Sequence, residues 1–129
     1  ENYRIIDYKT GGDSKKIKNI DLLFSDRKKD RNDAIFQLLF YSVLLKEKLN
    51  KNININPGLM NIREMNNKNF SINVSINDHQ LKNAKPYLKD FEDSLLKTLN
   101  KIFDLDQPFT QTEDADACLY CAYKNMCSR

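Results

Sequence analysis

Two side chains of opposite charge, Asp7 and Lys9, close an apolar run near the start of the sequence (YRIIDYKTGG, residues 3–12). Residues two apart lie on one face of a strand, and ionised groups are costly to bury without a partner or a metal ion. The carboxylate of Asp7 could bind Mg²⁺, the main-chain carbonyl of Tyr8 could add a second oxygen, and the Lys9 ammonium could position water or stabilise phosphate charge. This spacing suits phosphodiester hydrolysis, and the alternative is an ordinary ion pair at a strand end.

Two polar side chains, Gln37 and Tyr41, stand inside the apolar segment AIFQLLFYSVLL (34–45). Residues four apart lie on the same face of a helix, so both side chains point toward one place. Taken alone, the pair suits a buried glutamine bonded to the backbone beside a core tyrosine. Following a strand that ends in Asp-x-Lys, it also suits two side chains that serve one site.

Three cysteines, Cys118, Cys121 and Cys127, lie in the last twelve residues of the chain. Thiolates at such short spacings bind Zn²⁺ or an iron–sulfur cluster, and both normally take four ligands. His79, the single histidine, is a formal candidate for the fourth ligand, but its polar turn (77–80) predicts an exposed loop residue. The other interpretation is a set of reduced, partly buried thiols.

The pattern along the chain predicts a mixed α/β fold that carries these residues. After the first strand, the charge-rich stretch 13–31 predicts a mobile loop with a short apolar island. A long, mostly buried helix is expected over 34–45, with Asn32 or Asp33 as its N-cap and with basic residues in a last turn that reaches 51. The Asn-rich stretch 52–58 is expected to end it.

The second half of the chain predicts a hairpin, a helix and a tail. Strand-like alternation over 59–65 and 70–76, with a turn at 66–69, predicts two antiparallel strands. Apolar residues at helical spacing predict an amphipathic helix over 84–103. Residues 105–129 have no long periodic pattern and are expected to fold around the cysteines.

Composition sets only broad limits on function. The 129 residues are 40% hydrophobic and 30% charged, which suits one globular unit, and the net charge of +3 permits an anionic partner without requiring one. The lysine and arginine pairs are as consistent with solvated faces as with phosphate binding. The sequence has neither a long apolar run nor a signal-peptide pattern, so a cytoplasmic protein is the default expectation.

The order of the three motifs, IIDYKTG, then QLLFY, then CLYCAYKNMC, resembles the RecB-like nucleases of the PD-(D/E)XK superfamily. More closely, it is similar to the nuclease of AddB-type helicase–nuclease subunits. The resemblance implies a three-layer α/β/α core and a metal-dependent DNA exonuclease or endonuclease, acting with a helicase subunit or domain in DNA repair and recombination.

The resemblance also assigns roles to residues. It implies Asp7 as a ligand of Mg²⁺ or Mn²⁺, the Tyr8 carbonyl as a further ligand, and Lys9 as the catalytic lysine. Gln37 and Tyr41 would be the helix motif beside the active site and the DNA. Cys118, Cys121 and Cys127 would be three of the four ligands of a 4Fe–4S cluster.

Two features of the family pattern are not found in this sequence: the acidic residue on the strand before Asp-x-Lys, and the fourth cysteine. We therefore expect residues 1–129 to be the C-terminal part of one nuclease domain, with 105–129 as a Cys-rich tail, an incomplete cluster and little cleavage by this chain alone. Two alternatives remain at this level. One is a non-catalytic nucleic-acid-binding or scaffolding module with the same fold, and the other is a small zinc module.

Overall fold

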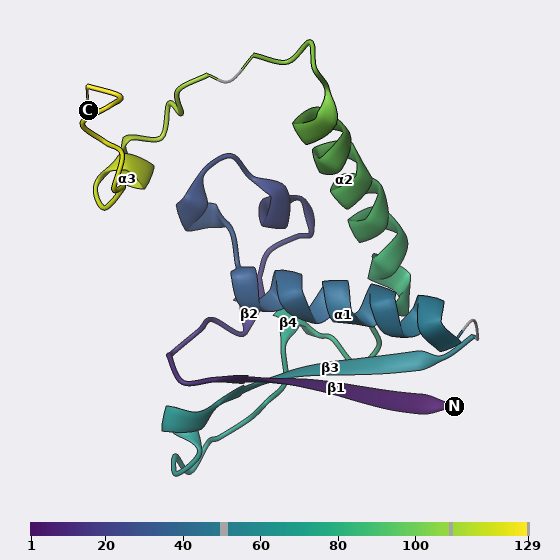
Figure 1. Cartoon of the computed structure of the whole chain (residues 1–129). Coiled ribbons are helices and arrows are strands. Elements are labelled where there is room, and N and C mark those ends of the chain that lie inside the picture. The colour runs from purple at the N-terminus through teal and green to yellow at the C-terminus, as the bar shows by residue number, and fades with distance from the viewer. Residues whose placement is uncertain (50–51, 109, 129) are drawn as a thin grey trace.

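The computed structural model describes residues 1–49, 52–108 and 110–128, and its centre is a β-α-β unit. Strands β1 (Asn2–Lys9) and β3 (Asn54–Asn61) are parallel and paired over their whole length. Helix α1 (Asp33–Leu49) connects them and lies along one face of the pair (Figure 1). This mixed α/β arrangement confirms the predicted fold class. Residues 50 and 51, to which the predicted last helical turn extended, lie outside the described residues.

Helix α1 begins where the sequence predicted. The Asn32 side-chain oxygen accepts a hydrogen bond from the Ile35 amide at 3.0 Å, so Asn32 is the N-cap. The Asn32 amide also donates to the carbonyl of Ser14 at 2.8 Å, which ties the preceding loop to the start of the helix. The cap therefore fixes where the helix starts and where the chain that follows β1 must run.

The prediction that 52–58 only ends the helix is wrong, because residues 54–58 belong to strand β3. Asn, Pro and Gly are typical of turns, but Ile53, Ile55 and Leu59 are buried, and their packing against the helical side outweighs the local preference. Gly58 is needed for a close approach, because a Cβ there would meet the Ile72 carbonyl oxygen at 3.2 Å.

The predicted antiparallel pair of 59–65 and 70–76 is wrong in most of its length. Residues Ile62–Glu64 form the 3₁₀ helix η3, and the returning segment meets β3 only at the bridge between Gly58 and Asn73. The chain then forms β4 (Ser75–Ile76), which pairs in parallel with β2 (Lys16–Ile17). Alternation over short segments could not reveal this partner, because the pairing depends on residues about sixty positions apart.

A tight hairpin places His79 at the surface. Strand β4 pairs in antiparallel fashion with β5 (His79–Gln80). The two residues of the turn, Asn77 and Asp78, have positive φ angles of 50° and 59°, as such two-residue turns require. The exposed position of His79 confirms the expectation of an exposed residue in a polar turn.

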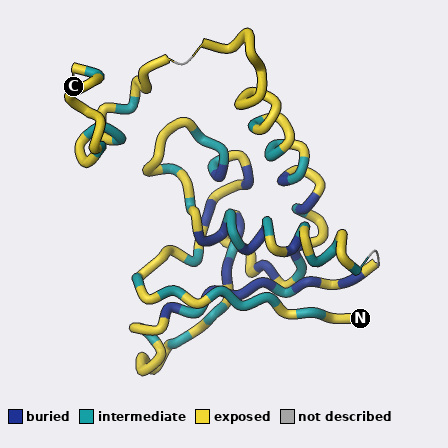
Figure 2. Tube along the Cα trace, viewed as in Figure 1, coloured by how far each residue is buried: buried dark blue, intermediate teal, exposed yellow. Residues whose placement is uncertain are grey.

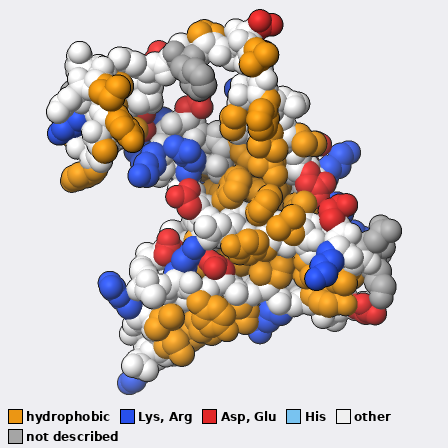
Figure 3. Space-filling view, viewed as in Figure 1, with side chains coloured by type: hydrophobic (Ala, Val, Ile, Leu, Met, Phe, Trp, Pro, Cys, Tyr) orange, Lys and Arg blue, Asp and Glu red, His pale blue; other side chains and the backbone are white. Residues whose placement is uncertain are grey.

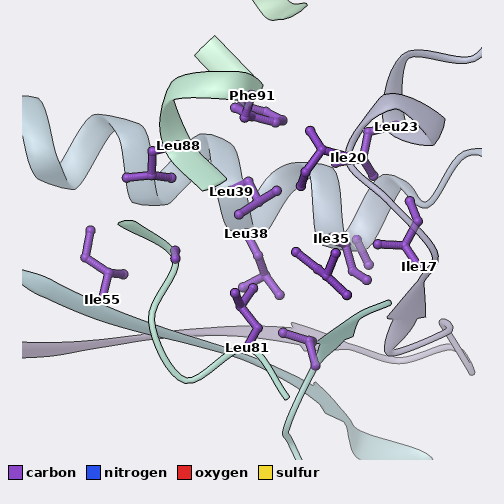
Figure 4. Close-up of a cluster of buried hydrophobic side chains, with 14 of the residues drawn as sticks. Ile17, Ile20, Leu23, Ile35, Leu38, Leu39, Ile55, Leu81, Leu88 and Phe91 are labelled. Carbon is purple, nitrogen blue, oxygen red and sulfur yellow. The ribbon is translucent and has the colours of Figure 1, made fainter. Parts of the chain in front are cut away.

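The stretch 13–31 is part of the core, which corrects the prediction of a mobile loop. Ile17, Ile20 and Leu23 are buried, the last of them in the 3₁₀ helix η1 (Asp21–Phe24), and η2 (Lys28–Asp30) follows. The charges between the apolar residues hid this role, because they face solvent while the apolar side chains point inward. Figure 4 shows these side chains pointing into the same cluster as those of α1.

The second long helix, α2 (Lys85–Phe103), confirms the predicted amphipathic helix. Its first half buries Leu88 and Phe91, and the Phe91 ring lies 5.4 Å from Phe24 and 5.1 Å from Phe36 between ring centroids. The second half leaves the core (Figures 1 and 2), and its exposed apolar residues are Leu96, Leu99, Ile102 and Phe103. None of the described helices is long and apolar enough to cross a membrane.

The C-terminal segment runs away from the sheet and carries the short helix α3 (Ala115–Cys118). Figure 2 shows it mostly exposed, in contrast to the buried layer between α1 and the strands. Its polar contacts with η2 include the Lys28 amide donating to Asp114 Oδ2 at 3.2 Å and an ion pair of 3.9 Å between Lys29 and Asp116. Residues 109 and 129 of the predicted tail lie outside the described residues.

Candidate active site

The end of β1 carries the first two candidate residues on one face, as strand alternation predicts. The Lys9 ammonium lies 3.1 Å from Asp7 Oδ2, and the two side chains are 24% and 17% exposed. Tyr8 lies between them on the opposite face with its side chain 62% exposed. The pair is therefore partly withdrawn from water at the carboxyl end of a parallel strand, where α/β proteins commonly place ligands.

Helix α1 brings Gln37 to the same place. Lys9 Nζ donates to Gln37 Oε1 at 2.5 Å, across 28 residues of sequence. Because the Gln37 oxygen is occupied by the ammonium, its NH₂ group is turned away from Lys9 and remains a donor for another molecule. The structure thus joins Asp7, Lys9 and Gln37 in one cluster that sequence analysis placed in two separate motifs.

Tyr41 lies one helical turn beyond Gln37 and is 43% exposed. Its ring centroid is 6.5 Å from that of Phe40, and it does not belong to the buried cluster of α1. Half of the tyrosine surface is thus available on the side of the helix that carries Gln37. Tyr41 therefore shares a helix face with Gln37, and the structure shows no contact between it and Asp7 or Lys9.

One oxygen of the cluster is buried and incompletely bonded. Asp7 Oδ2 is inaccessible to solvent and has no hydrogen-bond partner among the described residues, although the Lys9 ammonium is 3.1 Å away. The contact is short, but its geometry does not suit a hydrogen bond, which depends on angle as well as distance. We take the contact as an electrostatic pair that leaves this oxygen without a directed hydrogen bond.

A fourth polar residue, Asn61, was missed by sequence analysis. It ends β3 as the register partner of Lys9, and it is 1% exposed. Its Nδ2 donates to the Asp13 carbonyl at 2.9 Å and to Glu64 Oε1 at 3.0 Å. The sequence pattern predicts Asn61 in an antiparallel hairpin. Only the parallel register, which the pattern does not reveal, pairs Asn61 with Lys9.

Glu64 and Lys15 extend this network away from Lys9. The Lys15 ammonium donates to Glu64 Oε2 at 2.6 Å and lies 5.4 Å from the centroid of the Phe70 ring. The hydrogen bond from Lys15, followed by the one from Asn61, lowers the pKa of the Glu64 carboxyl. The loop after β1 is therefore connected to the end of β3 by charged and amide groups.

Comparison with protein families assigns the chain to a superfamily. The model of the PD-(D/E)XK nuclease superfamily matches residues 1–128. The chain belongs to this superfamily. Comparisons with curated proteins and with solved structures found no match. The match does not distinguish subfamilies, so membership of the RecB-like and AddB-type nucleases stays a prediction.

Nucleases of the PD-(D/E)XK superfamily generally use divalent metal ions, and Asp7 fits such an ion. Its Oδ2 is a buried anionic oxygen without a directed hydrogen bond, and hard cations take carboxylate oxygens. The described residues form no group of three or more His, Cys, Asp or Glu side chains that could hold a metal ion. Among them Asp7 would supply one carboxylate ligand and not a full coordination sphere.

The arrangement of the three cysteines gives no support to the predicted iron–sulfur cluster. Cys118, Cys121 and Cys127 are each half-buried and free, and they do not belong to any group of three or more His, Cys, Asp or Glu side chains among the described residues that could hold a metal ion. The Cys118 thiol is 3.9 Å from the Asp114 carbonyl oxygen, and the Cys127 carbonyl accepts from Gln111 at 3.1 Å. The predicted cluster therefore gains no support from the geometry, and we assign no chemistry to it.

The surface shows no single broad basic region on the face seen in Figure 3. Lysine and arginine side chains are spread over several places, with acidic side chains next to many of them. Apolar side chains gather along α2 and near the strands. On this face, charge alone does not mark a path for a nucleic acid.

Proposed function

We propose that the chain contributes the Asp-x-Lys half of a metal-dependent deoxyribonuclease site, with Mg²⁺ or Mn²⁺ as the cation and DNA as the substrate. The superfamily match supports a nuclease function for the domain to which the chain belongs. The observation that carries the proposal is the Lys9 ammonium, which is held between Asp7 at 3.1 Å and Gln37 at 2.5 Å.

The roles of the residues follow from their chemistry. Asp7 supplies a carboxylate oxygen to the cation, and the Tyr8 carbonyl is the proposed further ligand. Lys9, fixed by Gln37, is placed to orient the attacking water or to balance charge on the phosphate. When bound, the cation polarises a phosphate oxygen and lowers the pKa of a bound water.

The reaction is hydrolysis of a phosphodiester. The water oxygen bonds to phosphorus, one P–O ester bond breaks, and the products are an alcohol and a phosphate monoester. The NH₂ group of Gln37 and the exposed ring and hydroxyl of Tyr41 are available to the DNA backbone on the same helix face. Aromatic rings and amide donors are common contacts to nucleic-acid backbones and bases.

We further propose a helicase–nuclease context in DNA repair and recombination, with a helicase subunit or domain as partner and the cytoplasm as location. Support for this context comes from the order of the three sequence motifs. We also propose that these 129 residues alone cut DNA poorly. Support for this comes from the single carboxylate at the Lys9 ammonium and the lack of a three-ligand group among the described residues.

The test is substitution of Lys9 by alanine in the full-length protein. We expect Lys9→Ala to reduce DNA cleavage by at least about a hundredfold, in line with the loss of a positioned charge or proton-transfer group. Lys82→Ala is the matched control, since Lys82 is an exposed lysine whose amide bonds only the nearby Gln80 carbonyl. A folded Lys9→Ala protein that cuts at the unsubstituted rate would remove Lys9 from the mechanism.

A further inference from the structure

Asn61 is a buried residue whose side-chain amide has hydrogen bonds from its NH₂ group but none to its oxygen. Its Nδ2 donates to two acceptors, the Asp13 carbonyl and the Glu64 carboxylate, so the amide orientation is fixed by its neighbours. Its Oδ1 is inaccessible to solvent and has no hydrogen-bond partner among the described residues. Buried polar atoms are nearly always bonded, so an acceptor left unpaired inside a fixed amide points to a partner that arrives in another state of the site.

The position of Asn61 identifies Lys9 as that partner. The two residues are register partners on neighbouring parallel strands, whose side chains emerge about 5 Å apart on the same face. The ammonium of Lys9 has three donors, and its contacts are the Gln37 oxygen and the Asp7 carboxylate. Lys9 therefore retains donor capacity, and the residue paired with it on the neighbouring strand carries an unsatisfied acceptor.

A divalent cation can bind Asp7 Oδ2 only if the Lys9 ammonium moves away from it. Asp7 Oδ2 is inaccessible to solvent, and the Lys9 ammonium lies 3.1 Å from it. A divalent cation and an ammonium repel each other strongly at such distances. A cation that reaches Oδ2 must therefore displace the ammonium, while the bond to Gln37 allows Lys9 to turn without leaving the cluster.

We propose that Asn61 is a positioning residue that accepts the Lys9 ammonium when Asp7 turns to a divalent cation. The inference rests on the proposed nuclease function and adds a second position for the Lys9 ammonium. In the cation-free state Lys9 neutralises Asp7, and in the loaded state Lys9 lies between Gln37 and Asn61. The Glu64 carboxylate, itself paired with Lys15, accepts from Asn61 Nδ2 and so fixes which end of the amide is left as the acceptor.

The first test is a crystal structure of the unsubstituted full-length protein with Ca²⁺, which occupies carboxylate sites without requiring catalysis. We expect Ca²⁺ on Asp7, Lys9 Nζ within about 3.2 Å of Asn61 Oδ1, and a Lys9–Asp7 distance longer than the present 3.1 Å. Ca²⁺ on Asp7 with Asn61 Oδ1 still unpaired would overturn the inference alone. A structure with no cation on Asp7 would overturn the proposed function as well.

The second test is Asn61→Leu, which keeps a similar volume and removes both polar groups. Because the ammonium then lacks its alternative acceptor, we expect the Mg²⁺ concentration for half-maximal cleavage and the Ca²⁺ dissociation constant from calorimetry each to rise about tenfold. Asn54→Ala is the matched control, since Asn54 on the same strand also has two side-chain hydrogen bonds, to Asn2 and Asn83. It should leave both values unchanged.

Lys9 must be present for this effect. In the Lys9→Ala protein, adding Asn61→Leu should not change the Ca²⁺ dissociation constant, because the displaced group is already absent. An equal rise with and without Lys9 would show that Asn61 acts on the fold rather than through the lysine. If Asn61→Leu does not fold, the Ca²⁺ structure of the unsubstituted protein decides.

Discussion

Removal of Gln37 is the substitution whose effect can be followed most closely from the structure. Gln37 is half-buried, and its oxygen accepts from the Lys9 ammonium at 2.5 Å. Gln37→Ala deletes a hydrogen bond to a charged group, for which typical contributions are about 1.5–3 kcal/mol. Lys9 is still 24% exposed, so water replaces part of the bond and we take the lower end, about 1.5 kcal/mol.

The same energy sets the expected loss of activity. If Gln37 holds Lys9 at the reacting phosphate, about 1.4 kcal/mol corresponds to a tenfold change, and kcat/KM for DNA cleavage should fall about tenfold in the full-length protein. Gln37→Glu keeps an oxygen for the ammonium and should lose less than Gln37→Ala. The assay is steady-state cleavage of a labelled DNA at saturating Mg²⁺. A folded Gln37→Ala protein with unchanged kcat/KM would refute the role of this bond.

Two further predictions concern stability. Phe91→Ala should lower the free energy of unfolding by about 3–5 kcal/mol, because it empties a fully buried position beside the Phe24 and Phe36 rings. Urea unfolding measures this change, and a loss of less than about 1 kcal/mol would contradict the core described above. Glu64 has a lowered pKa, so its contribution to stability is present above its ordinary value of 4.5 and is lost as pH falls through the lower folded value. Thermal midpoints below pH 4.5 should therefore fall less steeply in Glu64→Gln than in the unsubstituted protein, and parallel curves would count against the Lys15–Glu64 pair.

The sequence predicted those parts of the site that depend on local spacing. Alternation along a strand places Asp7 and Lys9 on one face, and helical spacing places Gln37 and Tyr41 together. Both relations hold in the structure, because each is a property of one element. The order of the motifs and the family resemblance predicted that the two pairs serve one site, but the direct contact of Lys9 with Gln37 was not predicted, since it joins two elements.

The parts that were missed depend on pairing between distant segments. Asn61 enters the site through the parallel register of β1 with β3, and nothing in its own neighbourhood indicates that partner. Strand β3 also contains Pro57 and Gly58, which locally favour a turn, yet the strand is stabilised by burial against α1. In the same way, Ile20 and Leu23 lie among charged residues in the sequence, but in the structure they pack in one buried cluster with Phe91 of α2.

The central claim is that Asp7 provides a metal-ligating carboxylate to a DNA-cleaving site. Asp7→Asn keeps the shape of the side chain and removes its charge, and Asp21→Asn, at an exposed acidic residue of η1, is the matched control. The direct measurement is DNA cleavage by the full-length protein together with Mn²⁺ binding by electron paramagnetic resonance. We expect Asp7→Asn to lose both cleavage and tight Mn²⁺ binding and Asp21→Asn to retain them. Unchanged cleavage and Mn²⁺ binding in a folded Asp7→Asn protein would contradict it.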